Sequence, residues 1–173
     1  MSLDPFKNAI HTWLKKEVGE ELSSDRAVIW AEENGPRPKR PYATLKLVTP
    51  SQKPMGKDNL RQVTDPVTSA TKFFLNGPRR MFVDINIFGD GAVQLLTKAR
   101  DSLDNPIVIE FFECAGMQVE QEGTVSNETE LLESAFQQRA RMSMVFGFTF
   151  EREIDLKTVK ELEINGTTYN VGS

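Results

Sequence analysis

Residues 27–48 read AVIWAEENGPRPKRPYATLKLV, and the rest of the chain is organised around this stretch. Its two ends, 27–30 and 42–48, are rich in β-branched, aromatic and aliphatic residues, which favour strands. The connection between them carries several prolines and a glycine, so it can be neither a helix nor a regular strand. The stretch therefore predicts two short strands separated by an irregular segment.

The irregular segment has the composition of a stiff, exposed surface element. Asn34-Gly35 favours a left-handed turn, and the prolines that follow restrict φ and remove backbone donors. Between those prolines lie three cationic residues: Arg37, Lys39 and Arg40. We call residues 36–41 the ribbon and expect it to be an interaction surface, because a plain turn rarely combines several prolines with charge of one sign.

The composition is that of a single soluble domain. The chain has 173 residues, of which 39% are hydrophobic and 27% charged, and a core of that size needs neither disulfide nor metal. The 21 Lys and Arg against 25 Asp and Glu give a net charge of −4. This net charge argues against a protein that binds nucleic acid over its whole surface, but it permits a local basic patch.

The sequence contains no signal for export or for a membrane. No basic segment precedes an apolar N-terminal core, and no apolar run approaches the length of about 18 residues that a membrane span needs. The lone Cys114 excludes an intrachain disulfide, and its apolar neighbours predict that it is buried. We therefore expect a protein of the cytoplasm or of the virion interior.

The N-terminal residues predict an amphipathic helix. Asp4 is expected to be its N-cap and Pro5 its first residue, and the helix is expected to stop near Gly19. The apolar positions recur at spacings of three and four residues: Phe6, Ala9, Ile10, Trp13, Leu14 and Val18. His11 is expected on the helix surface, since no cysteine or second histidine accompanies it for a metal site.

The middle of the chain predicts a long surface loop and then a hairpin. Residues 49–65 lack periodicity, which is typical of a loop. Residues 67–75 and 80–88 have strand patterns, and Asn76-Gly77 between them favours a hairpin turn. The second run is the strongest candidate for a central strand, because Met81, Val83, Ile85 and Ile87 alternate with less apolar residues.

Two helices are expected next. Asp90 can cap the first, which carries Val93, Leu95, Leu96, Ala99 and Leu103. Asn105-Pro106 starts the second, over residues 107–115, and Gly116 ends it. The glycines at 89 and 91 have neither the spacing nor the Lys-Ser/Thr of a nucleotide-binding loop, which argues against a nucleotide site.

The C-terminal third predicts further strands. Residues 117–121 are a short strand candidate, and the acidic stretch 120–133 indicates an exposed connection or a single helical turn with solvated carboxylates. Residues 136–151 alternate almost without error and predict one strand of about 15 residues, longer than usual. Residues 159–171 predict a weaker hairpin that turns at Asn165-Gly166.

These elements predict an α+β fold: a mostly antiparallel sheet with helices packed on one face, plus a projecting hairpin or long strand. Residues 1–155 form the expected domain, and residues 156–173 a C-terminal extension or edge hairpin.

Three segments resemble the tail terminator or neck terminator proteins of tailed bacteriophages. They read VIWAEENGPRPKRPYATLKL, RRMFVDINIFGDGAVQLLTKARDSLDNP and FQQRARMSMVFGF. The matching family motifs are Val28-Ile29-Trp30, Asn34 to Tyr42, Phe88-Gly89, the Leu96, Arg100 and Leu103 pattern, and Gln138-Arg139-Ala140. The resemblance covers residues 6–150, with departures at Glu33 and Gly35.

The resemblance implies a structural virion protein rather than an enzyme, with no catalytic residue, metal or cofactor. It implies a ring, commonly of six subunits, that caps the head-proximal end of the tail tube, stops its polymerisation and joins it to head-completion proteins. DNA would pass through the lumen without specific binding.

Five basic residues are the candidates for subunit or partner contacts: Arg37, Lys39, Arg40, Arg139 and Arg141. The ribbon is expected in a subunit contact or at the lumen of the ring, and its cations can pair with the acidic stretch 120–133 of a neighbouring subunit.

Two other classes of protein remain open at this point. A tail tube, sheath or head–tail connector component of similar fold would polymerise openly, whereas a terminator makes one closed ring. A small hydrolase would use loop carboxylates, for instance Asp65 or Asp90 with Glu110, and would need a metal or a perturbed carboxylate cluster.

Overall fold

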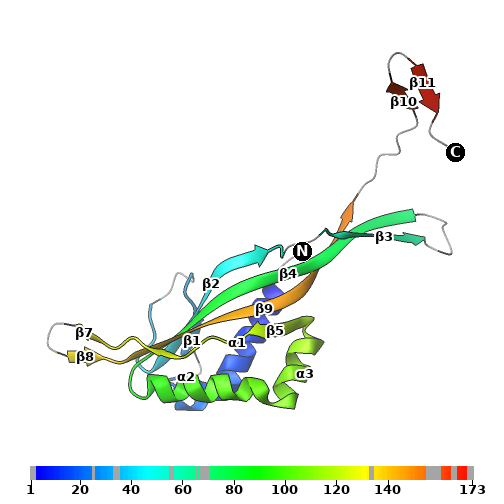
Figure 1. Cartoon of the computed structure of the whole chain (residues 1–173). Helices are drawn as coiled ribbons and strands as arrows, with labels where there is room; N and C mark the ends of the chain where they lie inside the picture. The colour runs from blue at the N-terminus through cyan, green and yellow to red at the C-terminus, as the bar shows by residue number, and fades with distance from the viewer. Residues whose placement is uncertain are drawn as a thin grey trace. The chain divides into compact units, whose positions relative to one another are not determined.

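The computed structural model of the chain is shown in Figure 1. It describes residues 3–24, 26–32, 36–54, 57–64, 66, 71–132, 135–154, 161–164 and 167–170. The chain divides into two compact units. The first unit is Met1–Lys57 with Pro78–Phe150, and the second is Asp58–Gly77 with Glu151–Ser173. Two long strands contribute residues to both units.

Helices cover one face of the sheet in the first unit (Figure 1). They are α1 (Asp4–Val18), α2 (Ala92–Asp101) and α3 (Pro106–Cys114), with 3₁₀ turns η1 (Gly19–Glu21) and η2 (Ser102–Asp104). All six apolar positions predicted for the first helix are buried. The predicted cap is wrong by one residue: Leu3 is the N-cap and Asp4 lies in the first turn, with the Lys7 amide donating to the Leu3 carbonyl at 3.0 Å.

The starts of α2 and α3 differ in their chemistry. Gly91, at φ +74°, is the cap of α2 and no side chain caps that helix, so the prediction of Asp90 as N-cap is wrong. A left-handed glycine already turns the chain into the helix here. Asn105 caps α3 as predicted, since its Oδ1 accepts from the Ile107 amide at 3.0 Å.

The main sheet has the strand order β1-β2-β4-β9-β5. Its strands are β1 (Val28–Trp30), β2 (Tyr42–Gln52), β4 (Thr71–Phe88), β5 (Met117–Gln121) and β9 (Arg139–Ile154), with β6 (Ser126–Asn127) also pairing with β9. Strands β1 and β2 are parallel, whereas the β2–β4, β5–β9 and β6–β9 pairs are antiparallel. The predicted α+β class with a mostly antiparallel sheet is confirmed.

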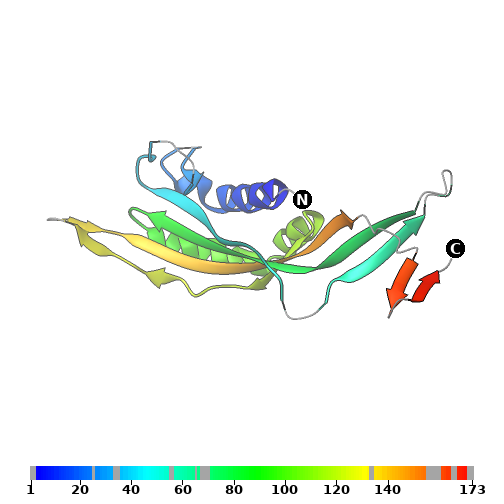
Figure 2. The same ribbon diagram turned by 90° about the horizontal axis from the view of Figure 1, so that it is seen from above.

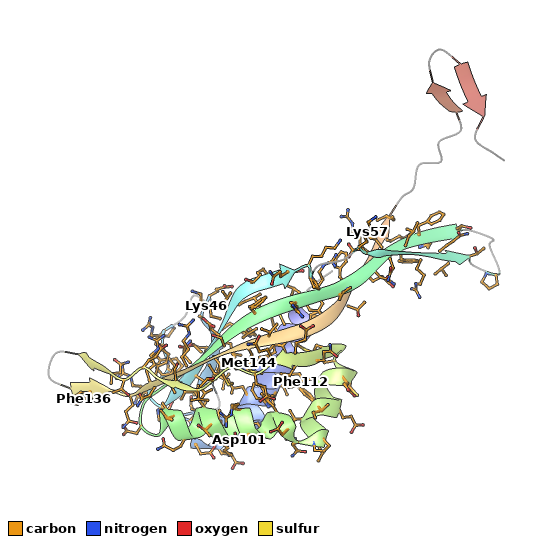
Figure 3. All side chains as sticks on the ribbon, viewed as in Figure 1. Lys46, Lys57, Asp101, Phe112, Phe136 and Met144 are labelled. Carbon is orange, nitrogen blue, oxygen red and sulfur yellow. The ribbon has the colours of Figure 1, made fainter. Side chains whose placement is uncertain are left out.

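The core lies between the sheet and the helices. The alternating residues predicted for the central strand, Met81, Val83, Ile85 and Ile87, are fully buried. On the neighbouring strand β9, Ala140, Met142, Met144, Phe146 and Phe148 belong to the buried core. Phe112 of α3 joins the layers: its ring centroid is 5.7 Å from that of Trp13 and 5.4 Å from that of Phe146. Figure 3 shows Phe112 and Met144 in this layer.

The long C-terminal strand is interrupted near its predicted start. Residues Ala135–Gln137 form β8, which pairs with β7 (Glu130–Leu132) in a hairpin, and β9 begins at Arg139. Phe136, the first residue of the predicted strand, therefore lies in β8 rather than in β9, and it is 76% exposed. The acidic stretch is extended rather than a helical turn, because it supplies β6 and β7.

The second unit corrects two predictions about the middle of the chain. Strand β3 (Asn59–Thr64) pairs with Thr71–Asn76 of β4, so residues 49–65 are not one long loop. Every residue of β3 is exposed, and a strand without a buried face has no apolar alternation to detect. Asn76-Gly77 is not a turn: Asn76 pairs with Asn59, and Gly77 is not among the glycines with positive φ.

The predicted C-terminal hairpin is confirmed as the antiparallel pair β10 (Glu161–Ile164) and β11 (Thr167–Asn170). Its predicted turn, Asn165-Gly166, lies outside the described residues, as do residues 67–70 of the predicted strand 67–75. The predicted boundary at residue 155 stays a prediction.

Candidate interaction surfaces

The C-terminal end of the ribbon contacts two segments, the one after α1 and the end of β4. The Ser23 amide donates to the Pro41 carbonyl at 2.9 Å, and the Ser23 hydroxyl donates to the Lys39 carbonyl. Tyr42, the next residue, stacks on Phe88 with ring centroids 5.0 Å apart. The Arg40-Pro41 peptide bond is cis. The ribbon is therefore irregular in structure but held in place, as its prolines predicted.

The three ribbon cations are exposed and form no ion pair with the part of the chain that the structure describes. Arg37, Lys39 and Arg40 are all exposed. No salt bridge to any of their side chains occurs within the described residues. The ribbon therefore presents positive charge that no described carboxylate pairs with.

A groove of about 430 Å³ lies beside the ribbon. Its lining comes from the segment after α1, from β1 and from the ribbon: Ser23, Ser24, Arg26, Ile29, Pro36, Arg37, Pro38 and Lys39. The groove combines an apolar wall, from Ile29 and the prolines, with three cations at its edge. An apolar side chain flanked by carboxylates fits such a surface.

Arg139 and Arg141, the other predicted contact residues, are engaged within the chain. The Arg141 guanidinium donates to Asp84 at 2.6 Å, and that of Arg139 donates to Asn86 at 3.0 Å. Both also face Glu128, at 3.3 Å from Arg139 and 3.8 Å from Arg141. These arginines join β9 to β4 and to the segment after β6, so they are not free in the way that the ribbon cations are.

The carboxylates expected to meet a neighbour's ribbon are also partly used within the chain. Glu120 forms a salt bridge with Arg80, and Glu128 pairs with Arg139 and Arg141. The side chains of Glu130 and Glu133 lie outside the described residues. Another acidic surface is therefore needed as the candidate partner of the ribbon.

Helix α3 exposes an apolar face that sequence reasoning missed. Only Val108 and Phe112 are buried, whereas Ile107 is 65%, Ile109 46% and Phe111 37% exposed. Cys114 is exposed too, so its predicted burial is wrong: it does not fall on the narrow stripe that Val108 and Phe112 turn to the core. The signal was present in the sequence, because PIVIEFFEC is apolar on more sides than one buried face requires.

The described residues show no arrangement typical of catalysis. Within the described residues no three His, Cys, Asp or Glu side chains gather to hold a metal. Asp90 and Glu110 are exposed and lack the desolvated surroundings of a catalytic carboxylic acid, and Asp65 lies outside the described residues. His11, expected on the helix surface, is half-buried and donates from Nε2 to the Val28 carbonyl at 3.0 Å. Among the helices described, none has the length and apolar character needed to cross a membrane.

Comparisons with known proteins place the chain in a family. No curated protein matches it. One solved structure that matches is 15% identical, covering 87% of this chain and 97% of the other with a TM-score of 0.46, a similarity too low to carry an argument. A sequence model of the family described as phage neck terminator protein matches residues 4–172. Because that match spans nearly the whole chain, the protein belongs to the phage neck terminator family.

Proposed function

We propose that the chain forms a closed ring at the head-proximal end of the phage tail tube, where it stops tube polymerisation and joins the tail to head-completion proteins. Family membership gives the coarser part of this function, a structural role in the tail or neck of a phage particle. Six is the subunit number that the resemblance implies. DNA leaving the head then passes through the lumen without specific binding.

The observation that carries the proposal is the extent of the family match, from residue 4 to residue 172. The match includes the helices, the sheet and the ribbon together, so it concerns the whole subunit rather than one motif. Exposed apolar side chains, and charges that no described residue pairs with, support the same function, since a ring subunit must contact two neighbours.

We assign the ribbon cations Arg37, Lys39 and Arg40 to a subunit contact. Their side chains are exposed, and the ribbon loses little conformational entropy on docking because its prolines already restrict it. For Arg139 and Arg141 we propose an indirect part: by holding Asp84 and Asn86, they fix the surface that β4 and β9 offer to a partner.

The proposal can be tested with the tail tube protein of the same phage, polymerised with and without this chain and viewed by negative-stain electron microscopy. We expect tubes that stop growing and carry a ring at one end. Incorporation along the tube, or open filaments of this chain alone, would identify a tube or sheath component instead. Unchanged tube length with no ring at either end would likewise contradict the proposal.

A further inference from the structure

We propose that the exposed face of α3 in one subunit docks into the groove beside the ribbon of the next subunit. The occupant of the groove is thus a second copy of this chain. This inference rests on the proposed ring and names the two surfaces that hold neighbouring subunits together.

The apolar part of the contact comes from α3. Ile107 and Phe111 are one helical turn apart, so they lie on the same side of the helix, and Cys114 continues that row. All three are exposed, at 65% for Ile107 and 37% for Phe111. A helix held to its own core by only Val108 and Phe112 has the rest of its surface available for a neighbour. The groove, at about 430 Å³ and walled by Ile29, Pro36 and Pro38, offers an apolar surface for this row.

The charges on the two surfaces are opposite. The segment 101–122, which contains α3, has six acidic residues and no lysine or arginine: Asp101, Asp104, Glu110, Glu113, Glu120 and Glu122. Glu110 and Glu113 are exposed on α3, and no salt bridge reaches them within the described residues. The ribbon cations carry no salt bridge within the described residues either, and Arg26 joins Arg37 and Lys39 as a third cation lining the groove. Asp101 and Glu120 pair with Arg100 and Arg80, so the charges of Glu110 and Glu113, which carry no salt bridge within the described residues, are the ones that favour pairing with the ribbon of another chain.

The two surfaces lie at opposite ends of α1. At its C-terminal end, Ser23 follows the helix and bonds to the ribbon. At its N-terminal end, Phe6 packs on Phe148 with ring centroids 4.8 Å apart and lies near Gly116, the residue that ends the α3 segment. Figure 2 shows α1 (blue) with the ribbon at its left end and α3 (yellow-green) near its right end. With 15 residues at 1.5 Å per residue, α1 is about 22 Å long.

Two different surfaces at opposite ends of a subunit make a heterologous contact. Each subunit then uses its ribbon towards one neighbour and its α3 towards the other, and such a contact closes into a ring when the rotation between neighbours allows it. A self-complementary contact would instead stop at a dimer.

Charge reversal tests the interface. The ribbon variant Arg37→Glu/Arg40→Glu and the helix variant Glu110→Lys/Glu113→Lys each place like charges opposite one another, so each alone should reduce ring-capped tail tubes by about tenfold or more. A mixture of equal amounts should restore capping, because an acidic ribbon then meets a basic α3 and the reverse. The matched control is Lys16→Glu/Lys57→Glu, which reverses two exposed lysines outside both surfaces and should cap tubes as the wild type does.

Cross-linking provides a second test that does not depend on reversing charge. Lys39 lines the groove, and Cys114 is the only cysteine in the chain. With a short bis-maleimide, the Lys39→Cys variant assembled on tail tubes should give a ladder of covalent oligomers. No ladder should form with the wild type, with Lys57→Cys, or with the double variant Lys39→Cys/Cys114→Ser.

The outcomes separate the interface from the proposed function. Wild-type protein that caps no tubes contradicts the proposed function. Wild-type protein that caps tubes, with both charge variants capping equally well, overturns only the interface. The interface is also overturned by a mixture that caps no better than its components, or by the absence of a ladder with Lys39→Cys.

Discussion

At the scale of single residues, Gly89 shows how local geometry supports the ribbon. Its φ is +116°, a conformation that other residues rarely adopt. A Cβ at this position would lie 2.9 Å from the Cα of Pro41 and 3.2 Å from the Cβ of Arg40. The absence of a side chain thus lets the end of β4 pass directly beside the end of the ribbon.

Gly89→Ala should therefore destabilise the protein by roughly 2–4 kcal/mol, through backbone strain together with a steric clash. Gly91→Ala is the matched control, since Gly91 has φ +74° but a Cβ added there would meet no atom within 4 Å. It should cost about 1 kcal/mol, from strain alone. Urea unfolding of the two variants measures the difference. Equal losses of unfolding free energy in the two variants would show that the close approach of Pro41 to Gly89 adds nothing to the cost of the Gly89→Ala substitution.

A second residue-scale prediction contrasts two phenylalanines. Phe146 is fully buried against Phe112, so Phe146→Ala should lower the free energy of unfolding by about 3–5 kcal/mol. Phe136 lies on the β7–β8 hairpin (Figure 3). Its side chain is 76% exposed, so Phe136→Ala should change the free energy of unfolding by no more than about 0.5 kcal/mol. Thermal or chemical denaturation tests both. A large loss for Phe136→Ala would mean that this side chain is packed in the folded protein.

At the scale of elements, one exposed ion pair joins η1 to α2. The Lys98 ammonium lies 2.7 Å from the Glu21 carboxylate, and this hydrogen bond lowers the pKa of Glu21 and raises the pKa of Lys98. Both side chains are largely exposed, so water screens the pair.

Lys98→Met should therefore cost no more than about 0.5 kcal/mol. The loss should be constant between the ordinary pKa values of 4.5 for Glu21 and 10.5 for Lys98. It should vanish as the pH falls through the lowered pKa of Glu21, or rises through the raised pKa of Lys98. Unfolding free energies of wild type, Lys98→Met and Glu21→Gln across this range measure it. A loss that persists after Glu21 is protonated would assign the effect to packing of the Lys98 stem.

Elements with one buried face were predictable from the sequence, and elements without one were not. Residues 80–88 and the body of β9 alternate because one face meets the helices. Strand β3 has no buried residue, so its sequence looks like that of a loop. Asn76-Gly77 carries a hairpin signal, but pairing of β4 with β3 keeps that position extended, and tertiary context overrides the local preference.

The two candidate surfaces also differ in whether the sequence predicted them. The ribbon was predictable because proline and clustered charge act locally, whatever surrounds them. The exposed face of α3 was not, because an apolar sequence does not say which of its sides another element covers. The intrachain contacts of Arg139 and Arg141 were not predictable either. They depend on how β4 and β9 lie beside each other, which brings Asp84 and Asn86 within reach of the two guanidinium groups.

At the scale of the whole molecule, we expect the free protein to be a monomer or a weak oligomer that closes into a ring on the end of the tube. An interface that must form only at the end of assembly has to be weak in solution. Light scattering over a wide concentration range tests this. A stable ring at the lowest concentration, or filaments at any concentration, would contradict it.

The last prediction concerns DNA at the scale of the assembled ring. Contacts with phosphates supply most of the non-specific affinity of proteins for DNA. A lumen rich in Lys and Arg would therefore bind the genome and slow its passage. The net charge is −4 per subunit, and ribbon cations that pair with α3 are no longer available to phosphates. We therefore expect no measurable affinity for duplex DNA at physiological salt, from the free protein or from rings on tubes. Fluorescence anisotropy with a labelled duplex measures it over a series of salt concentrations. Micromolar or tighter binding that persists as the salt is raised would instead make Arg37, Lys39 and Arg40 a DNA-facing surface.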